Sequence, residues 1–189
     1  MRVTGGQFGG RGLIAPADMR VRPTSDKVRQ AIFNILTHHD FANGFALEGA
    51  AVIDLFAGTG ALGIEALSRG AKFCLFVDDD AESRALQREN IEKLGLTGVS
   101  KIWRRDAADL GPVNTGSSGP FRLAFLDPPY RKGLAEKALQ SLCDGGWLAA
   151  DAVVVVETAT DETLDAPGFI KLDERDYGET RVTLLAAAE

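Results

Sequence analysis

The pattern of apolar and polar positions along the chain changes character near residue 50. From there on, short apolar runs alternate with segments whose apolar residues recur at helical spacing. The short runs indicate buried strands, and the spaced segments indicate amphipathic helices. The expected strands span 52–56, 73–77, 99–103, 123–126 and 152–157, and the expected helices span 60–69, 81–94 and 133–143. This alternation predicts a mostly parallel sheet with helices on both faces.

The C-terminal part departs from the alternation. Residues 169–176 and 180–186 have the pattern of two further strands, joined near Gly178. Between the third and fourth expected strands, residues 106–110 are expected to form one helical turn. Residues 111–120, rich in glycine, serine and proline, are expected to form a surface loop.

The N-terminal part also departs from it. Residues 2–14 hold two β-like pieces around a glycine-rich centre, which predicts a flexible hairpin. Residues 24–26, Thr-Ser-Asp, offer N-caps for a helix that runs to Leu36. We therefore expect a single domain over 1–189, in which an N-terminal extension over 1–36 precedes a core over 51–189.

The composition is that of an ordinary globular protein, with 189 residues of which 45% are hydrophobic and 25% charged. No apolar run reaches the roughly 20 residues that a membrane span needs, and the first residues lack the apolar centre of a signal peptide. Cys74 and Cys143 lie far apart in apolar contexts, as expected of free thiols in a reducing compartment. No Cys/His cluster has metal-ligand spacing. We expect a cytoplasmic protein, taken as a monomer, without membrane contact or metal.

The distribution of charge changes the picture that the net charge suggests. A net charge of −6 argues mildly against a nucleic-acid partner. Residues 1–31, however, carry six basic side chains against two acidic ones, so this arm has a charge of +4 and the rest of the chain −10. A basic arm on an acidic body is typical of a protein that binds a polyanion, although a solvated tail has the same composition.

A glycine turn follows the first expected strand. The segment 58–63, Gly-Thr-Gly-Ala-Leu-Gly, satisfies the pattern G-x-G-x-x-G and opens the next helix. Asp78 lies 20 residues beyond Gly58, at the end of the next strand, where an acid binds ribose hydroxyls. Asp79 and Asp80 are expected to face solvent or to cap the following helix. A tight structural turn would use the same glycines, but the combination favours a nucleoside cofactor.

The residues before the turn help to choose the cofactor. A dinucleotide would place its pyrophosphate at the helix N-terminus, where Asp54 would repel it. A carboxylate suits instead the ammonium and sulfonium groups of S-adenosylmethionine. The pattern Asp54-x-Phe56-x-Gly58-x-Gly60 therefore favours S-adenosylmethionine over NAD. Asp106, after the third strand, is placed either to accept from the adenine amino group or to cap a short helix.

The segment Asp127-Pro128-Pro129-Tyr130 follows another buried strand. Its prolines stiffen the turn and hold Asp127 and Tyr130 at the carboxyl edge of the sheet, where ligands bind in this architecture. The exocyclic amine of a base is a poor nucleophile, because its lone pair is delocalised into the ring. Asp127 and the carbonyl of Pro128 can each accept one N–H of such an amine, and Tyr130 can stack on an extruded base.

These motifs resemble those of class I S-adenosylmethionine-dependent methyltransferases, and most closely the bacterial 16S ribosomal RNA guanine-N2 methyltransferases of RsmD type. The similarity rests on the segments 5–11, 22–36, 54–69, 127–130 and 146–148. It implies an α/β Rossmann-like fold with a seven-stranded, mostly parallel sheet whose last strand is antiparallel, preceded by a small hairpin and helix. It also implies methylation of a guanine in 16S ribosomal RNA, either free or in the small subunit.

The resemblance implies that basic side chains hold RNA phosphate. The candidates are Arg11, Arg20, Arg22 and Lys132. The family usually has basic residues where this chain has Gly9 and Gly12, so only Arg11 remains of that cluster. We expect the arm to grip RNA less tightly, or to depend more on the other candidates.

Other functions remain open from sequence alone. Adenine-N6 and protein glutamine methyltransferases use similar Pro-Pro-Tyr turns, although an ionised Asp127 matches the two adjacent donors of guanine better than the donor and acceptor of adenine. An NAD-dependent dehydrogenase would lack an obvious proton donor, since the only histidines precede the cofactor strand. A non-catalytic RNA-binding module would not need acids at the strand ends, where Asp54, Asp78 and Asp127 stand.

Overall fold

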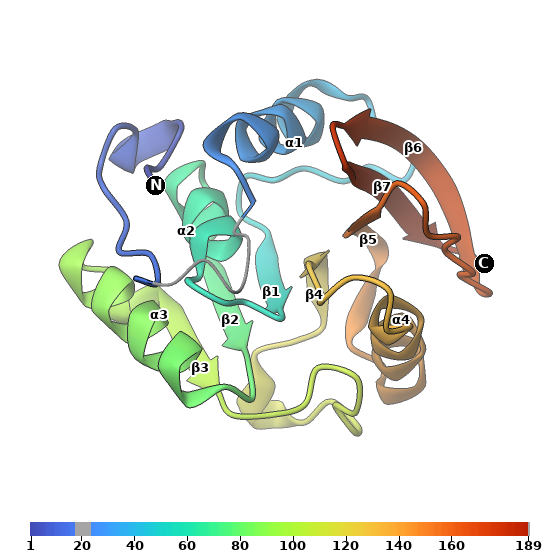
Figure 1. The fold of residues 1–189 in the computed structure, drawn as a ribbon. Helices are drawn as coiled ribbons and strands as arrows, with labels where there is room; N and C mark the ends of the chain where they lie inside the picture. Colours follow the sequence, from blue (N-terminus) through green and yellow to red (C-terminus); the bar gives the residue numbers. More distant parts are fainter. Residues whose placement is uncertain (18–23, 189) are drawn as a thin grey trace.

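The computed structural model describes residues 1–17 and 24–188, and a seven-stranded sheet runs through its centre (Figure 1). The strands are β1 (Ala51–Leu55), β2 (Phe73–Val77), β3 (Ser100–Trp103), β4 (Phe121–Leu126), β5 (Leu148–Ala159), β6 (Phe169–Tyr177) and β7 (Thr180–Ala187). Every residue of β1 is buried, and β2, β4 and β5 carry long buried runs as well. Such continuous burial is typical of strands that are covered on both faces.

The strands follow the order β3-β2-β1-β4-β5-β7-β6 across the sheet. The first five in this order pair in parallel, whereas β7 runs antiparallel to both β5 and β6. The predicted class I methyltransferase fold, with its antiparallel last strand, is therefore confirmed. The strand order reverses between β1 and β4, and open sheets of this kind bind ligands beyond the carboxyl ends of the strands at such a point.

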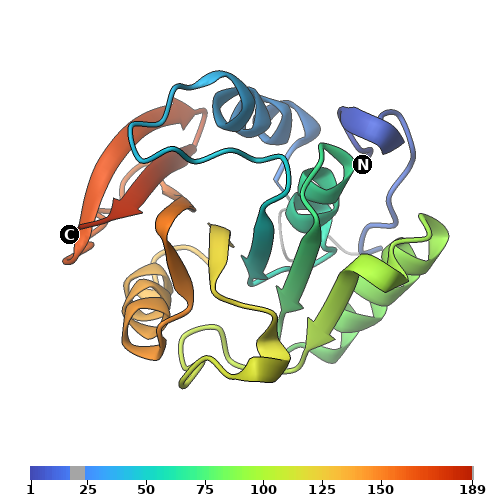
Figure 2. The ribbon, with the colours of Figure 1, turned by 180° about the vertical axis from the view of Figure 1, so that it is seen from behind.

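Helices cover both faces of the sheet (Figure 1, Figure 2). They are α1 (Asp26–His38), α2 (Ala61–Ser68) and α3 (Ala81–Lys93) on one face and α4 (Leu134–Gly145) on the other. α1 begins after Ser25, whose side chain accepts a hydrogen bond from the amide of Val28 at 3.2 Å. The N-cap expected at the start of this helix is therefore present.

Two hydrophobic clusters fill the space between the sheet and the helices. The first joins Ile32 and Phe33 of α1 to Phe125 of β4, and the second joins Leu139 of α4 to Leu126 of β4. Phe125 and Leu126 belong to different clusters because successive strand residues point to opposite faces. Since α1 shares its cluster with the sheet, the N-terminal extension packs directly on the core.

The predicted N-terminal hairpin is wrong in detail. Among residues 1–17, the two β-like pieces meet in one isolated bridge, between Arg2 and Gly12, and the 3-10 helix η1 (Gly6–Phe8) lies between them. Gly6 has a φ of +76°, and a Cβ on it would lie 2.0 Å from the carbonyl oxygen of Ser68. The glycines therefore let this segment lie against the end of α2, a close approach that other residues would block.

The same segment is docked rather than flexible. The amides of Thr4 and Gly5 donate hydrogen bonds to the carboxylate of Glu65, at 2.8 and 3.1 Å. The guanidinium Nε atoms of Arg29 and Arg69 donate to the same carboxylate, at 3.1 and 3.0 Å. Glu65 is fully buried, so this polar cluster fixes the first residues of the chain onto α2.

The single helical turn predicted over 106–110 is a hydrogen-bonded turn instead. The amide of Asp109 donates to the carbonyl of Asp106 at 3.0 Å, and no helix forms there. The Asp106 carboxylate accepts from the amide of Ala108 at 2.9 Å. Such a side-chain bond to the local backbone competes with helix formation, which explains the difference.

Candidate functional site

Three acidic side chains meet at the carboxyl edge of the sheet, beside the point where the strand order reverses. Asp54 of β1 lies level with Phe125 of β4, which in turn lies level with Val155 of β5. Asp127 and Glu157 stand two residues beyond these partners. Because strand residues alternate between faces, all three acids lie on the face that α1 and α2 cover. This edge is therefore the candidate site.

The glycine turn that follows β1 is tightly built. Gly58 and Gly60 have φ angles of +55° and +83°, which favour glycine, and Phe56 adopts a φ of +55° although it carries a side chain. Residues held in this region of backbone space cluster at functional sites. Gly63 allows α2 to approach β2 closely, because a Cβ there would lie 2.4 Å from the Phe76 ring.

Side chains from the next strand and helix hold the turn in shape. Asp78, after β2, accepts a hydrogen bond from the amide of Gly58 at 2.9 Å. From α3, Gln87 donates to the carbonyl of Gly58 at 2.9 Å and Asn90 donates to the carbonyl of Thr59 at 3.1 Å. The Gln87 Oε1 atom is buried and has no partner among the described residues. Gln87, which holds the turn, thus keeps an acceptor that no described residue uses.

Asp54 lies beneath the turn and is only 1% exposed. Its Oδ2 atom accepts from the amide of Gly63, 3.0 Å away in the first turn of α2. Burial raises the pKa of Asp54 well above its usual value, and repulsion from Asp127 and Asp78 adds to this rise. Asp54 therefore supports the helix N-terminus from within, and its contact with a cofactor stays a prediction.

Asp106 is exposed and forms the local turn already described. Because no helix forms there, the helix-capping role that the sequence left open is not seen, and the side chain holds a local turn instead. Its contact with an adenine amino group stays a prediction.

The Asp-Pro-Pro-Tyr turn places its two polar side chains at the site. The Oδ2 atom of Asp127 accepts from the Thr24 hydroxyl at 3.0 Å, and burial raises the pKa of Asp127. The Tyr130 hydroxyl lies 3.0 Å from Thr180 Oγ1, and burial raises the pKa of Tyr130 to about 12, so the phenol is neutral. Among the described residues, none donates to the Pro128 carbonyl. The backbone just after the turn is unusual as well, because Arg131 has a φ of +61°.

Sequence reasoning missed Thr24 and Glu157 as site residues. Glu157 is only 2% exposed, and its two carboxyl oxygens lie 3.0 and 2.9 Å from Thr24 Oγ1. A signal was present, because the valine run of β5 ends in an acid, just as the apolar runs of β1 and β4 do. The role of Thr24 had no local signal, since 103 positions separate it from Asp127.

The predicted RNA-binding residues are only partly described. Arg11 is exposed on the N-terminal segment and Lys132 is exposed just after Tyr130, whereas Arg20 and Arg22 lie outside the described residues. Gly12 is one of the two positions where the family usually has a basic residue. Its carbonyl accepts a hydrogen bond from Lys93 Nζ at 3.0 Å.

One basic residue of the arm is not available to a partner. Arg29 is fully buried and forms ion pairs with Glu65 at 3.1 Å and Asp26 at 2.7 Å. The charge that the arm offers is therefore smaller than its composition suggests.

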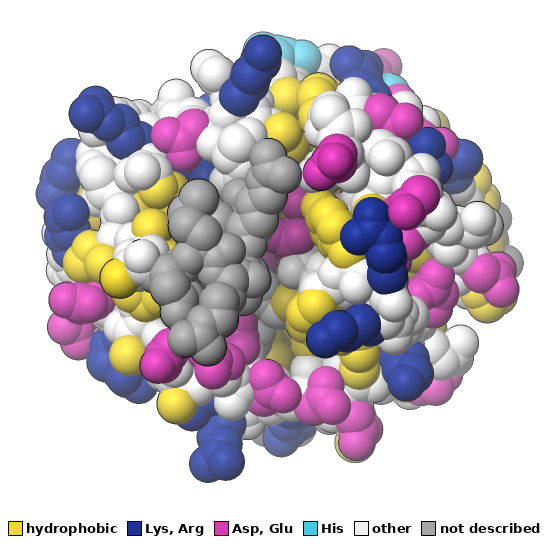
Figure 3. All heavy atoms as spheres, in the orientation of Figure 1, with side chains coloured by type: hydrophobic (Ala, Val, Ile, Leu, Met, Phe, Trp, Pro, Cys, Tyr) yellow, Lys and Arg dark blue, Asp and Glu magenta, His cyan; other side chains and the backbone are white. Residues whose placement is uncertain are grey.

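Figure 3 shows the face of the molecule that is turned toward the viewer in Figure 1. Acidic side chains lie in the hollow at its centre, and Lys or Arg side chains lie on its right-hand rim.

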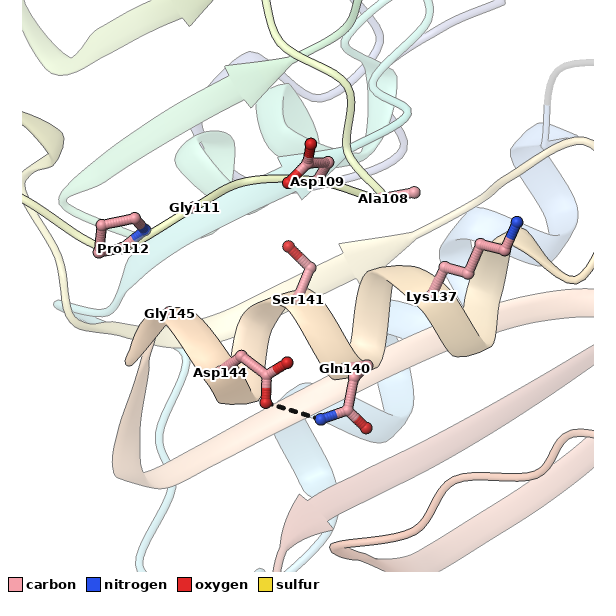
Figure 4. A pocket seen from close by; sticks show the side chains of 9 residues that line it. All are labelled: Ala108, Asp109, Gly111, Pro112, Lys137, Gln140, Ser141, Asp144 and Gly145. Atoms are coloured by element: carbon pink, nitrogen blue, oxygen red, sulfur yellow. Dashed lines mark hydrogen bonds between the residues drawn. The ribbon is translucent and has the colours of Figure 1, made fainter.

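A separate cavity of about 460 Å³ lies between the loop 108–112 and α4 (Figure 4). Lys137, Ser141 and Asp144 line its α4 side. None of the predicted site residues that the structure describes lines this cavity, and α4 covers the other face of the sheet. It is therefore not part of the candidate site.

Within residues 1–17 and 24–188, none of the helices has the length and apolar character of a membrane span. The same residues contain no group of three or more His, Cys, Asp or Glu side chains arranged to hold a metal ion.

The chain is similar to proteins of known family. The family model described as conserved hypothetical protein 95 matches residues 1–186. The ribosomal RNA small subunit methyltransferase D of Escherichia coli strain K12 is 36% identical over 167 residues, which cover 87% of this chain and 77% of the relative. The protein of the same name from Haemophilus influenzae is 32% identical over 181 residues, covering 94% and 89%.

Solved structures agree with the sequence relatives. The Escherichia coli protein yhhF superposes with a TM-score of 0.80 at 30% identity, covering 99% of this chain and 97% of its own. A Haemophilus influenzae protein, HI0767, superposes with a TM-score of 0.78 at 30% identity, covering 100% and 98%. The chain therefore belongs to the RsmD-type methyltransferase family, whose model is described as conserved hypothetical protein 95.

Proposed function

We propose that this protein transfers a methyl group from S-adenosylmethionine to the N2 amine of a guanine in 16S ribosomal RNA. The observation that carries the proposal is the position of Asp127, a carboxylate held by Thr24 at the sheet edge, one strand away from the glycine turn. Family membership supports the enzyme class, and the relatives named above carry ribosomal RNA in their names.

The glycine turn and its neighbours fit S-adenosylmethionine. Asp78 accepts from the amide of Gly58 at Oδ2 and from the amide of Asp80 at Oδ1. A carboxylate has about four acceptor sites, so Asp78 keeps capacity for a ribose diol. The unpartnered Oε1 of Gln87 adds an acceptor beside the turn. We assign cofactor binding to Asp54, Phe56, Gly58, Gly60, Asp78 and Asp106. When bound, this cofactor supplies an electrophilic methyl group.

The residues of the Asp-Pro-Pro-Tyr turn would hold the target amine. Asp127 and the Pro128 carbonyl each accept one N–H, which draws the nitrogen lone pair out of conjugation with the ring. Tyr130, neutral and tied to Thr180, presents an aromatic ring on which the base can stack. The catalytic contribution is mainly one of positioning, because methyl transfer requires an in-line approach.

The acceptor character of Asp127 favours guanine over adenine. The Watson–Crick edge of guanine has two adjacent donors, N1–H and the N2 amine, and an ionised carboxylate can accept from both. Adenine places an acceptor, N1, beside its amine, and that atom would face the carboxylate unfavourably. A paired base cannot present this edge, so the target guanine is unpaired or flipped out.

Basic side chains would contact the phosphate backbone. We assign this role to Arg11, Arg20, Arg22 and Lys132, of which Arg11 and Lys132 are exposed in the structure. The partner is 16S ribosomal RNA, either free or in the small subunit, and the enzyme works as a cytoplasmic monomer with a single domain.

The test is transfer of labelled methyl groups from S-adenosylmethionine to small-subunit RNA and to assembled subunits. We expect wild type to label one of these substrates and Asp127→Asn to retain a small fraction of the rate. Asp165→Asn, at an exposed position outside the site, serves as the control and should retain full activity. Absence of label in both substrates with the wild-type protein would overturn the proposal.

A further inference from the structure

We propose that Thr24, Asp127 and Glu157 form a unit that shares a single proton, in which a neutral Glu157 positions an ionised Asp127. Sharing of the proton follows from the geometry of the three side chains. The benefit to catalysis rests on the proposed function, in which Asp127 receives the base.

The hydroxyl of Thr24 lies between two carboxyl groups. Its Oγ1 atom is 3.0 Å from Asp127 Oδ2 and 3.0 and 2.9 Å from the two oxygens of Glu157. A hydroxyl has one hydrogen to donate, so it can satisfy only one of the two carboxyl groups. If both were ionised, the other would face a lone pair of Oγ1. A proton on one carboxyl removes this conflict, because that group can then donate.

Among the described residues, the surroundings do not supply a compensating charge. Asp54 faces the pair from β1, Tyr130 faces it from the following turn, and β7 contributes Val182 opposite Glu157. Arg29 of α1 donates to the backbone carbonyl of Thr24, at 3.3 Å, but its ion pairs are with Glu65 and Asp26. Among the described residues, no Lys or Arg forms an ion pair with either carboxyl group. Two buried charges would therefore repel each other without relief from residues 1–17 and 24–188.

Glu157 is the member that holds the proton. It is 2% exposed, whereas Asp127 is partly open to the site. Burial raises the pKa of Glu157 well above its usual value, and repulsion from Asp127 raises it further. With Thr24 bound to Oδ2, Asp127 keeps its other oxygen for the N–H groups of the base. Glu157 therefore acts through Asp127, as a positioning residue.

The active form is then the pair with one proton, which predicts a bell-shaped pH profile. Activity falls on the acid side when Asp127 takes up a proton and can no longer accept both N–H groups. It falls on the alkaline side when Glu157 loses its proton, because the pair then carries two charges. Since burial raises the pKa of both groups, both limbs lie above the pH at which free side chains would titrate.

Two variants at one position test the positioning role. Glu157→Gln keeps the shape and a donor group, so it imitates the neutral acid, whereas Glu157→Ala removes both. We expect Glu157→Ala to lower kcat about tenfold or more, in line with the cost of an unsatisfied buried group, with little change in the affinity for S-adenosylmethionine. We expect Glu157→Gln to recover most of that loss at neutral pH and to lose the alkaline limb while keeping the acid limb.

Infrared difference spectroscopy tests the proton without any activity. The spectrum of wild type minus Glu157→Gln, taken at pH 7, should contain the C=O stretch of a protonated carboxylic acid. Absence of that band, or a Glu157→Gln enzyme as slow as Glu157→Ala with its alkaline limb intact, would overturn the inference. If the band is present but wild type methylates no RNA, the shared proton stands and the proposed function fails.

Discussion

The carboxylate of Asp78 accepts a hydrogen bond from the amide of Gly58 at 2.9 Å, across 20 positions of the chain. A spacing of this size is typical of an acid that binds ribose hydroxyls, and the structure shows that the same acid also supports the glycine turn. Asp78 therefore links the end of β2 to the loop after β1, and both would face the cofactor.

We predict that Asp78→Ala weakens the binding of S-adenosylmethionine while the protein stays folded. Each charge-assisted hydrogen bond lost costs roughly 1.5–3 kcal/mol. Calorimetry with the cofactor measures the loss, and the neighbouring exposed Asp79→Ala serves as the control. An affinity equal to that of wild type in a folded Asp78→Ala variant would remove Asp78 from the site.

The close approach of α2 to β2 leads to a prediction about stability. A Cβ at Gly63 would lie 2.4 Å from the Phe76 ring and 2.6 Å from Cys74 Sγ, so Gly63→Ala should overpack the core. We expect a loss of about 1–3 kcal/mol in the free energy of unfolding, measured with urea. Gly98→Ala, where a Cβ would meet nothing within 4 Å, should change little. Equal stabilities of the two variants would contradict the packing described.

Glu65 binds the N-terminal segment to α2, and its loss should be costly. Glu65→Ala leaves the fully buried Arg29 without its buried partner, for which about 3–5 kcal/mol is typical. Urea unfolding measures the change, with the exposed Glu89→Ala of α3 as the control. Because the N-terminal segment is bound to α2 in this way, deleting the first residues would change stability as well as RNA binding. A Glu65→Ala protein as stable as its control would show that this cluster does not hold the fold together.

Arg11 offers a cleaner test of the arm, because its side chain is exposed. If it contacts phosphate, Arg11→Ala should weaken RNA binding uniformly and reduce the slope of log affinity against log salt by about 1. The exposed Lys72, which precedes the amino end of β2 and so lies away from the carboxyl edge of the sheet, provides the control variant Lys72→Ala. Identical salt slopes for the two variants would count against a phosphate contact at Arg11.

Local sequence patterns predict most of the fold but not every site residue. The strands, the glycine turn and the Asp-Pro-Pro-Tyr turn were predictable, because apolar periodicity and turn glycines act over a few residues. The contact between Thr24 and Glu157 spans 133 positions, and only the assembled sheet brings them together. The prediction of a flexible hairpin was wrong for a similar reason. Its glycines allow a close approach to Ser68, which lies far along the chain.

Identification of the methylated nucleoside tests the central claim most directly. Small-subunit RNA treated with the enzyme and S-adenosylmethionine is digested to nucleosides and analysed by mass spectrometry. The account predicts N2-methylguanosine, strongly reduced with Asp127→Ala although cofactor binding persists. Recovery of N6-methyladenosine, with no N2-methylguanosine, would contradict it.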